Sequence, residues 1–276
     1  MKDQVALITG ASAGIGLAVS RALAAQGCRL VLAARSPERL LAAQQQIDPS
    51  GEGSLVFPAD VSDPNDLSRL VDAAIERFGA IDILINNAGV DCFCHFESVP
   101  IDQILQTIEI NLTGTILLTR LVIPHMLSQG RGTIINMAST AGKHCPPYGA
   151  VYGATKAGLI AFTQGLRGEF LDRGISSTAI CPGFTASGGI YDRIVAATGR
   201  RTSTVLGGTT AEKVADGVVK AVRSGAPEII INYPPIRPAS VFREIFPRLG
   251  ERLANRVSRK FTRRAADADS EQATGR

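Results

Sequence analysis

The sequence has no tryptophan, and aromatic residues make up only 5% of its 276 residues. Its five cysteines are odd in number and scattered along the chain. Cys92 and Cys94 stand close together, but no second group of ligands accompanies them to complete a zinc site. We therefore expect neither a metal site nor a disulfide framework, and we expect reduced thiols in the cytoplasm.

Long apolar runs are also missing, and none reaches the length that spans a bilayer. Residues 1–4 lead directly into a strand pattern, so we expect no signal peptide. The net charge of +4 is unevenly placed, because residues 237–264 hold nine Lys and Arg against two Asp and Glu. Residues 1–236 hold 19 against 20 and are nearly neutral. The basic character therefore belongs to the C-terminal segment, and we expect no nucleic-acid partner.

Short apolar runs alternate with helical patterns along the first 231 residues. Apolar runs of this kind are typical of buried parallel strands. We expect seven strands, at 4–9, 29–34, 54–60, 81–85, 132–138, 175–181 and 228–231. We also expect helices at 64–78, at 101–127 and at about 211–224. The pattern predicts a single α/β domain over 1–236, built as a Rossmann-type, doubly wound parallel sheet.

A glycine-rich turn, Gly10-x-x-x-Gly14-x-Gly16, joins the first strand to a helix. Glycines let the backbone approach phosphate closely, and the free N–H groups at a helix N-terminus attract anions. The same stretch contains Gly10-x-Ser12-x-Gly14, which is the nucleophile-elbow pattern of serine hydrolases. An elbow needs an earlier loop to complete its oxyanion hole, and nine preceding residues are too few for one. The turn is therefore interpreted as a phosphate cradle.

Arg35 follows the second strand directly. The residue at this strand end faces the adenosine ribose of a bound dinucleotide, and an arginine there can pair with a 2′-phosphate. Arg35 therefore favours NADP(H) over NAD; the alternative is an ordinary exposed arginine.

Tyr152 and Lys156 lie four residues apart and share one face of the expected helix. A fixed ammonium beside a phenol lowers the pKa of the phenol and makes it useful for proton transfer. Ser139 ends the strand at 132–138, at the sheet edge where open parallel sheets bind ligands. By itself, a Tyr and a Lys at this spacing would more often be a solvated surface pair, and the surrounding motifs reverse that interpretation.

Two asparagine-containing segments add to this pattern. Asn86-Asn87-Ala88-Gly89 follows the fourth strand and could pass close to a cofactor, although a purely structural turn would explain it nearly as well. Asn111 stands inside the expected helix at 101–127, where asparagine is unfavourable unless it finds a partner.

Taken together, these segments resemble the short-chain dehydrogenase/reductase family over roughly residues 4–232. The resemblance rests on Thr9-Gly10-x-x-x-Gly14-x-Gly16, Asp60, Asn86 to Gly89, Asn111, Ser139, Tyr152-x-x-x-Lys156 and Pro182-Gly183. It implies hydride transfer between NADP(H) and the carbonyl or secondary alcohol of a small substrate. Tyr152 would be the general acid or base, Lys156 would tune it, Ser139 would bind the substrate oxygen, and Asn111 would hold a proton-relaying water.

The resemblance also implies a set of cofactor contacts. These are Gly10, Ser12, Gly14, Ile15 and Gly16 at the phosphates, Asp60 and Val61 at the adenine, and Asn87, Ala88 and Gly89 at the ribose and ring, with Tyr152, Lys156, Pro182, Gly183 and Thr185 completing the site. Two positions depart from the family pattern. Ala13 stands where many NADP-using members carry a second basic residue, and Ser187 aligns with the family's threonine after Pro-Gly.

Residues 184–208 are rich in Gly, Ser and Thr and are expected to form a substrate lid. Phe93, His144, Tyr148 and Phe184 are expected to line an apolar substrate pocket.

The C-terminal segment repeats apolar residues at a helical spacing with arginines between them. These apolar residues are Val241, Ile245, Leu249, Leu253, Val257 and Phe261. We expect a basic amphipathic helix over 237–264, interrupted near Pro247, and a disordered tail over 265–276. Such a helix could lie on an anionic membrane, or its apolar stripe could pack on the body or on a sister subunit.

The leading prediction is an NADP-dependent reductase that forms a homodimer or homotetramer. Two alternatives remain open: an NAD-dependent dehydrogenase of the same fold, and a dinucleotide-binding regulatory protein without catalytic activity.

Overall fold

The computed structural model describes residues 1–186, 191–192, 195–196, 199 and 207–273. Its centre is a parallel sheet of seven strands in the order β3-β2-β1-β4-β5-β6-β9. The strands are β1 Val5–Thr9, β2 Arg29–Ala34, β3 Ser54–Pro58, β4 Ile83–Asn86, β5 Gly132–Met137, β6 Ile175–Pro182 and β9 Glu228–Ile231. The order reverses between β1 and β4, which is where such sheets bind ligands. The predicted doubly wound, seven-stranded sheet is confirmed.

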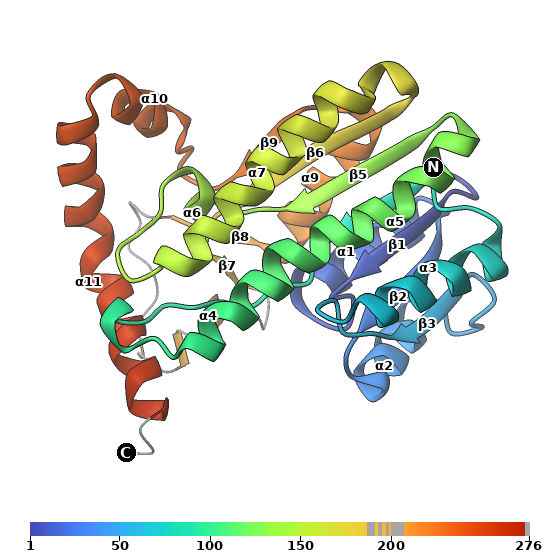
Figure 1. Cartoon of the computed structure of the whole chain (residues 1–276), viewed down its shortest axis with the longest axis horizontal. Helices are drawn as coiled ribbons and strands as arrows, with labels where there is room; N and C mark the ends of the chain where they lie inside the picture. Colours follow the sequence, from blue (N-terminus) through green and yellow to red (C-terminus); the bar gives the residue numbers. More distant parts are fainter. Residues whose placement is uncertain (187–190, 193–194, 197–198, 200–206, 274–276) are drawn as a thin grey trace.

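Helices cover both faces of the sheet (Figure 1). One face packs against α3 Pro64–Phe78, α5 Gly114–Gln129 and α7 Ala150–Phe170, and the other against α1 Gly14–Ala25, α2 Pro37–Ile47 and α9 Ala211–Ser224. Further helices in the described residues are α4 Ile101–Ile108, α6 Thr140–Lys143, α10 Arg237–Ile245 and α11 Pro247–Ala273, with short turns at Phe96–Ser98, Glu109–Thr113 and Leu171–Arg173. A small parallel pair, β7 Thr185–Ala186 and β8 Thr209–Thr210, lies beside the main sheet.

Capping residues explain why several boundaries were predictable. At the start of α3, the Asp63 side chain accepts a hydrogen bond from Asn65 N, and Pro64 occupies the first turn. Gly79 ends this helix in the left-handed conformation, with φ of 76°. In α9, the Thr210 side chain caps the N-terminus by accepting from Lys213 N, and Gly225 ends the helix in the left-handed conformation. The expected helices at 64–78 and 211–224 are therefore observed with those bounds.

The expected long helix at 101–127 contains an irregular turn. A π-helical segment at Glu109–Thr113 separates α4 from α5, and the helix continues through Pro124 to Gln129. The stretch Ile101–Gln129 is long and apolar enough to cross a membrane, yet half of its most apolar window is buried inside the protein. Its packing on the sheet accounts for that composition.

The C-terminal segment forms a helical hairpin. Helices α10 and α11 meet at Phe246–Pro247, as expected from the proline, and they lie along one side of the layered body in Figure 1. The structure differs from the expected tail at 265–276, because α11 continues to Ala273. The reason is burial: Ala265 and Ala266 pack against the body. Much of the expected lid at 184–208, including Ser187, lies outside the described residues.

Candidate active site

A cleft of about 540 Å³ opens beyond the carboxyl ends of the strands. One end is lined by the glycine turn between β1 and α1 and by Asn87, Ala88 and Gly89 after β4. The middle is lined by Ser139, Tyr152 and Lys156, and the far end by α10 and α11. The sheet edge thus brings segments that are distant in the sequence into one site.

Ser139 lies at the start of the short helix α6, directly after β5. Its Oγ accepts a hydrogen bond from Ala141 N at 3.1 Å, which leaves the hydroxyl proton free for another acceptor. Gly142 in α6 packs on the backbone of α7: a Cβ there would lie 2.6 Å from the carbonyl carbon of Lys156. This close contact brings Ser139 to the side of α7 that carries Tyr152 and Lys156.

The Lys156 side chain is buried and donates a hydrogen bond from Nζ to Met137 O at 2.9 Å. Burial lowers the pKa of this ammonium to about 8. Its Nζ lies 5.7 Å from the centre of the Tyr152 ring. The ammonium therefore lies beside the tyrosine, as the spacing predicted.

The expected shift of the Tyr152 pKa does not occur in this structure. Burial raises the pKa of Tyr152 to about 12, whereas the neighbouring Ser139 hydroxyl acts in the opposite direction. The Phe93 ring, 5.7 Å away between centroids, is part of the apolar surroundings. The spacing of Tyr152 and Lys156 indicated a nearby cation, but it could not indicate how deeply the phenol is buried.

Asn111 lies in the π-helical turn and is fully buried. Its amide donates to Val90 O and accepts from Val90 N, both at 2.8 Å, so the expected partner is the backbone after β4. A Cβ on Gly89 would lie 3.1 Å from Asn111 Oδ1 and 3.4 Å from Lys156 Nζ. Asn111, Gly89 and Lys156 are therefore direct neighbours.

The glycine turn fits a bound dinucleotide. Gly10 and Gly14 have φ of 65° and 58°, and a Cβ on Gly16 would lie 2.1 Å from Gly10 O. Asn87 Nδ2 donates to Thr9 O at 2.9 Å and so fixes the turn against β4. Helix α1 begins without a side-chain cap, which leaves its first N–H groups available for phosphate.

The residues expected to contact the adenosine, Arg35, Asp60 and Val61, are not among the residues that line the cleft. Arg35 is exposed directly after β2, and Asp60 follows β3, where its carboxylate accepts from Ser62 N at 2.9 Å. Val61 follows Asp60 and packs on α5 at Gly114. Ser12 and Gly16 belong to the glycine turn but do not line the cleft, whereas Gly10, Gly14 and Ile15 do. The structure thus places these groups along the ends of β1, β2 and β3.

The segment after β6 forms another wall of the cleft. Pro182, Gly183 and Thr185 all line it, and Thr185 Oγ1 donates to Gly183 O at 2.9 Å. A Cβ on Gly183 would lie 1.9 Å from Asn232 Oδ1, so any larger residue there would displace the Asn232 side chain.

Aromatic side chains surround the substrate side of the cleft. Phe93, His144 and Phe184 line it as predicted, and Tyr191 joins them. Phe184 and Tyr191 pack on Phe261 of α11, with ring centroids 5.2 and 6.4 Å from that ring. The prediction for Tyr148 is wrong: its ring packs on His95 and does not line the cleft.

The sequence did not predict that α10 and α11 would line one end of the cleft. Their lining residues are Ala239, Phe242, Arg243, Gly250, Leu253, Ala254, Asn255, Val257 and Ser258, together with Ile236 directly before α10. The helical spacing of the apolar residues was visible, but the face turned toward the cleft depends on how the two helices cross.

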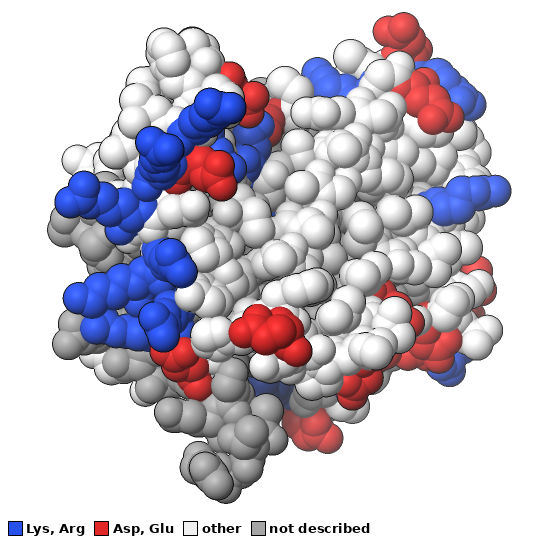
Figure 2. Space-filling model, turned by 60° about the vertical axis from the view of Figure 1, so that its left-hand side comes forward, with Lys and Arg blue, Asp and Glu red and all other residues white. Residues whose placement is uncertain are grey.

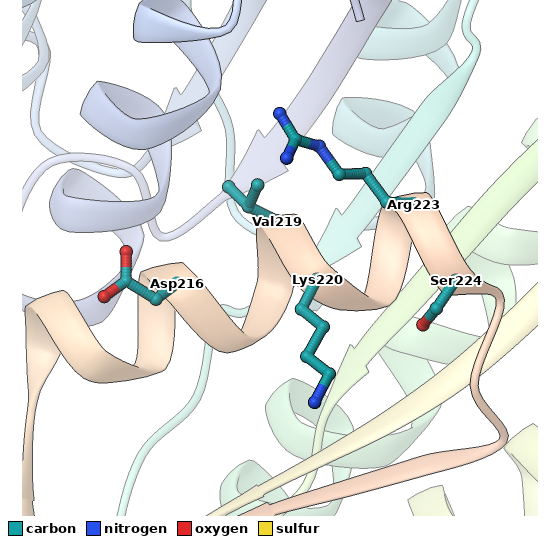
Figure 3. Close-up of a pocket in the computed structure, with 5 residues that line it drawn as sticks. All are labelled: Asp216, Val219, Lys220, Arg223 and Ser224. Carbon is teal, nitrogen blue, oxygen red and sulfur yellow. The ribbon is translucent and has the colours of Figure 1, made fainter.

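A separate hollow of about 300 Å³ lies on the surface of α9. Figure 3 shows that all five of its lining side chains project from this one helix. It shares no residue with the cleft described above.

Comparison with known proteins agrees with this geometry. The family model for short chain dehydrogenase matches residues 4–193. The chain belongs to the short-chain dehydrogenase family. It is therefore an oxidoreductase with a Rossmann-type NAD(P)-binding fold, and the resemblance inferred from its motifs is confirmed.

Similar short-chain dehydrogenases include ketoacyl reductases. The chain is 36% identical over 237 residues to the ketoacyl reductase HetN of Nostoc sp. strain PCC 7120, covering 86% of this chain and 81% of that protein. Its fold matches a variant of the actinorhodin polyketide ketoreductase with NADPH at a TM-score of 0.75 and 29% identity, covering 84% and 98% of the two chains. A metagenomic short-chain oxidoreductase in complex with NADP gives a TM-score of 0.72 at 29% identity, with 83% and 97% covered.

Replacing Tyr152 with Phe should remove the proton donor while keeping the half-buried ring. We expect turnover to fall by about 10²- to 10⁴-fold, the usual contribution of a general acid, with coenzyme affinity nearly unchanged. Steady-state assays and NADPH fluorescence titration measure the two effects. Tyr233→Phe is the matched control because Tyr233 is exposed. Near-normal turnover of Tyr152→Phe would refute the role of this phenol.

The lowered pKa of Lys156 predicts a pH dependence. The ammonium is charged below a pKa of about 8 and neutral above it, whereas Tyr152, with its raised pKa, stays protonated in this range. Ketone reduction should therefore be constant at lower pH and decline as pH rises through about 8. In Lys156→Arg, whose cation does not titrate there, residual activity should show no such decline. A wild-type rate that is unchanged across this pH range would contradict the requirement for the charge.

Proposed function

We propose that this short-chain dehydrogenase reduces the carbonyl group of a small, largely apolar substrate with NADPH. The observation that carries the proposal is the meeting of Ser139, Tyr152 and Lys156 in one cleft with the glycine turn at the start of α1. The turn suits a dinucleotide phosphate, and the three side chains suit a carbonyl oxygen. NADPH, when bound, supplies a hydride from C4 of its nicotinamide.

The protein groups then act on the substrate oxygen. Ser139 can donate its hydroxyl proton to that oxygen, because its Oγ already accepts from Ala141 N. Donors of this kind are often worth about 2.7–4 kcal/mol as negative charge develops. Tyr152 holds its proton because burial raises its pKa, so it is suited to protonating the developing alkoxide. The buried charge of Lys156 beside it favours proton release.

Preference for NADPH rests on Arg35. Its position directly after β2 suits pairing with a 2′-phosphate, and the side chain is exposed. Ala13 supplies no second basic group at the glycine turn. The two similar structures with NADPH or NADP support the same preference. An NAD-dependent enzyme of the same fold is the alternative.

The substrate is proposed to be a ketone or a ketoacyl compound. Phe93, Phe184 and Tyr191 provide an apolar wall, and the similarity to ketoacyl reductases points to the same class. A regulatory protein that only binds a dinucleotide is the competing function. A panel of aliphatic keto esters and aryl ketones, assayed with NADPH and with NADH, separates the two. Oxidation of neither coenzyme with any ketone would overturn the proposed reaction.

We propose a cytoplasmic homodimer or homotetramer. All five cysteines are thiols, in keeping with a reducing compartment. Ile101, Leu105 and Ile108 expose apolar side chains along α4, which gives a second copy a surface to cover.

Peripheral contact with an anionic membrane is proposed through the tip of the α10–α11 hairpin. Val241, Ile245, Phe246 and Leu249 are exposed there, with Ile245 at 63% and Phe246 at 53%. The amphipathic stripe thus remains largely uncovered in the monomer, except for buried Phe261. Arginines follow on α11 at 248, 252 and 256, and Figure 2 shows Lys and Arg gathered along one edge of this side. Apolar and cationic side chains together suit an anionic bilayer surface.

Replacing Arg35 with Ala should weaken NADPH use by removing its ion pair with the 2′-phosphate. We expect kcat/KM with NADPH to fall by about tenfold or more, the size of one charge-assisted hydrogen bond, and kcat/KM with NADH to change little. Lys220→Ala removes a charge on the surface of α9 and serves as the control (Figure 3). Equal losses with both coenzymes would contradict the assignment.

A double substitution, Ile245→Glu with Phe246→Glu, should abolish binding to vesicles of phosphatidylcholine and phosphatidylserine in a co-sedimentation assay. Carboxylates at the hairpin tip are repelled by the surface and costly to insert. Leu41→Glu, at a similarly exposed apolar position on α2, should bind as the wild type does. Identical sedimentation of the wild type and the double variant would exclude this contact.

A further inference from the structure

The charges lining the cleft have one sign. Arg243 and Lys156 are the only Lys or Arg among its described lining residues, and none of those residues is Asp or Glu. Lys156 is buried and donates to Met137 O. Arg243 is therefore the cation left to meet a ligand at the α10–α11 end.

Helix packing holds Arg243 at this wall. Ile236, Ala239, Phe242 and Arg243 line the cleft from one face of α10 and its entry. The Arg243 stem crosses α11 at Gly250, where a Cβ would lie 2.7 Å from Arg243 Cα and 3.0 Å from its Cγ. The stem is half-buried in this crossing. This close contact between the two helices fixes the position of the Arg243 backbone and of the first part of its side chain.

A directional chain of hydrogen bonds holds the head group. Arg243 Nη1 donates to His144 Nδ1 at 3.0 Å. A guanidinium can only donate, so Nδ1 is the acceptor and His144 is neutral with its proton on Nε2. That proton points to Ser240 Oγ at 2.7 Å, and Ser240 Oγ donates to Ile236 O at 3.1 Å.

The charge of Arg243 is left uncompensated by these contacts. Its partner His144 is neutral, and burial together with the Arg243 charge lowers the pKa of His144. No carboxylate lies within ion-pair distance of the guanidinium in the described part of the chain. A half-buried cation beside a neutral partner attracts an anion more strongly than a fully solvated one does.

We propose that Arg243 binds an anionic group at the end of the substrate remote from its reacting carbonyl. The substrate is then an amphiphilic ketone. Its carbonyl meets Ser139 and Tyr152, its apolar body packs among Phe93, Phe184 and Phe242, and its carboxylate or phosphate pairs with Arg243. The inference rests on the proposed carbonyl reduction and specifies its substrate class.

Matched pairs of substrates test this assignment. Methyl-ketone carboxylic acids of increasing chain length are assayed with NADPH beside their methyl esters, and phosphate monoesters of hydroxy ketones form a third arm. At one chain length, the wild type should prefer an anionic substrate over its neutral ester by about tenfold or more in kcat/KM. The acid and phosphate arms show which anion the site takes.

Arg243→Gln should remove this preference, mainly by raising KM for the anionic substrate, and should raise KM for the ester far less. Arg243→Lys should restore part of it, because the charge remains but the planar fork is lost. Arg237→Gln, on the same helix but outside the cleft lining, should behave as the wild type. Thermal unfolding of each variant shows that the hairpin remains folded.

Four results decide whether Arg243 forms an anion site. Equal loss for acid and ester in Arg243→Gln, or no anion preference in the wild type at any chain length, would overturn the anion site while leaving carbonyl reduction intact. If the wild type reduces none of these ketones, thermal-shift titration with the acids still decides the site. Acids that stabilise the wild type but not Arg243→Gln would support the anion site. Acids that stabilise both proteins equally would refute it.

Discussion

A buried ammonium ion holds the active-site helix to the sheet. Lys156 Nζ donates to Met137 O at the last residue of β5, two residues before Ser139. Because Tyr152 precedes Lys156 by one helical turn, the same hydrogen bond sets the distance between the phenol and the serine. Gly142 lets α6 lie directly on the α7 backbone and completes this arrangement. A buried charge is costly, and here it lies where proton transfer is proposed to occur.

Two different parts of the chain form the rest of the cleft. The sheet edge supplies the glycine turn, the segment after β4 and the segment after β6, and these belong to the family fold. The α10–α11 hairpin follows the region that the family model matches and closes the substrate end. Fold and proposed chemistry therefore come from one part of the chain, whereas the proposed substrate preference comes largely from another.

Much of this arrangement was predictable from the sequence, because local signals agreed with the fold. Short apolar runs between helical patterns placed all seven strands, and the helical spacing that ends before Gly79 placed α3. The motif residues around Ser139 and Tyr152 were predicted to share a cleft, and they do.

Long-range packing explains what could not be predicted. The pKa of Tyr152 depends on burial beside Phe93, which is far away in the sequence. Arg243 reaches the cleft only because α10 and α11 cross at Gly250. Residues 265–276 were expected to be disordered from their composition and terminal position, yet Ala265 and Ala266 are buried.

Isotope transfer tests the central claim most directly. Wild-type enzyme is incubated with a reducible ketone and NADPH that carries deuterium at both hydrogen positions of nicotinamide C4, and the product alcohol is analysed by mass spectrometry. Direct hydride transfer predicts one deuterium on the carbinol carbon of the product. An alcohol formed without deuterium at that carbon, or deuterated coenzyme left unchanged with every ketone, would contradict the account.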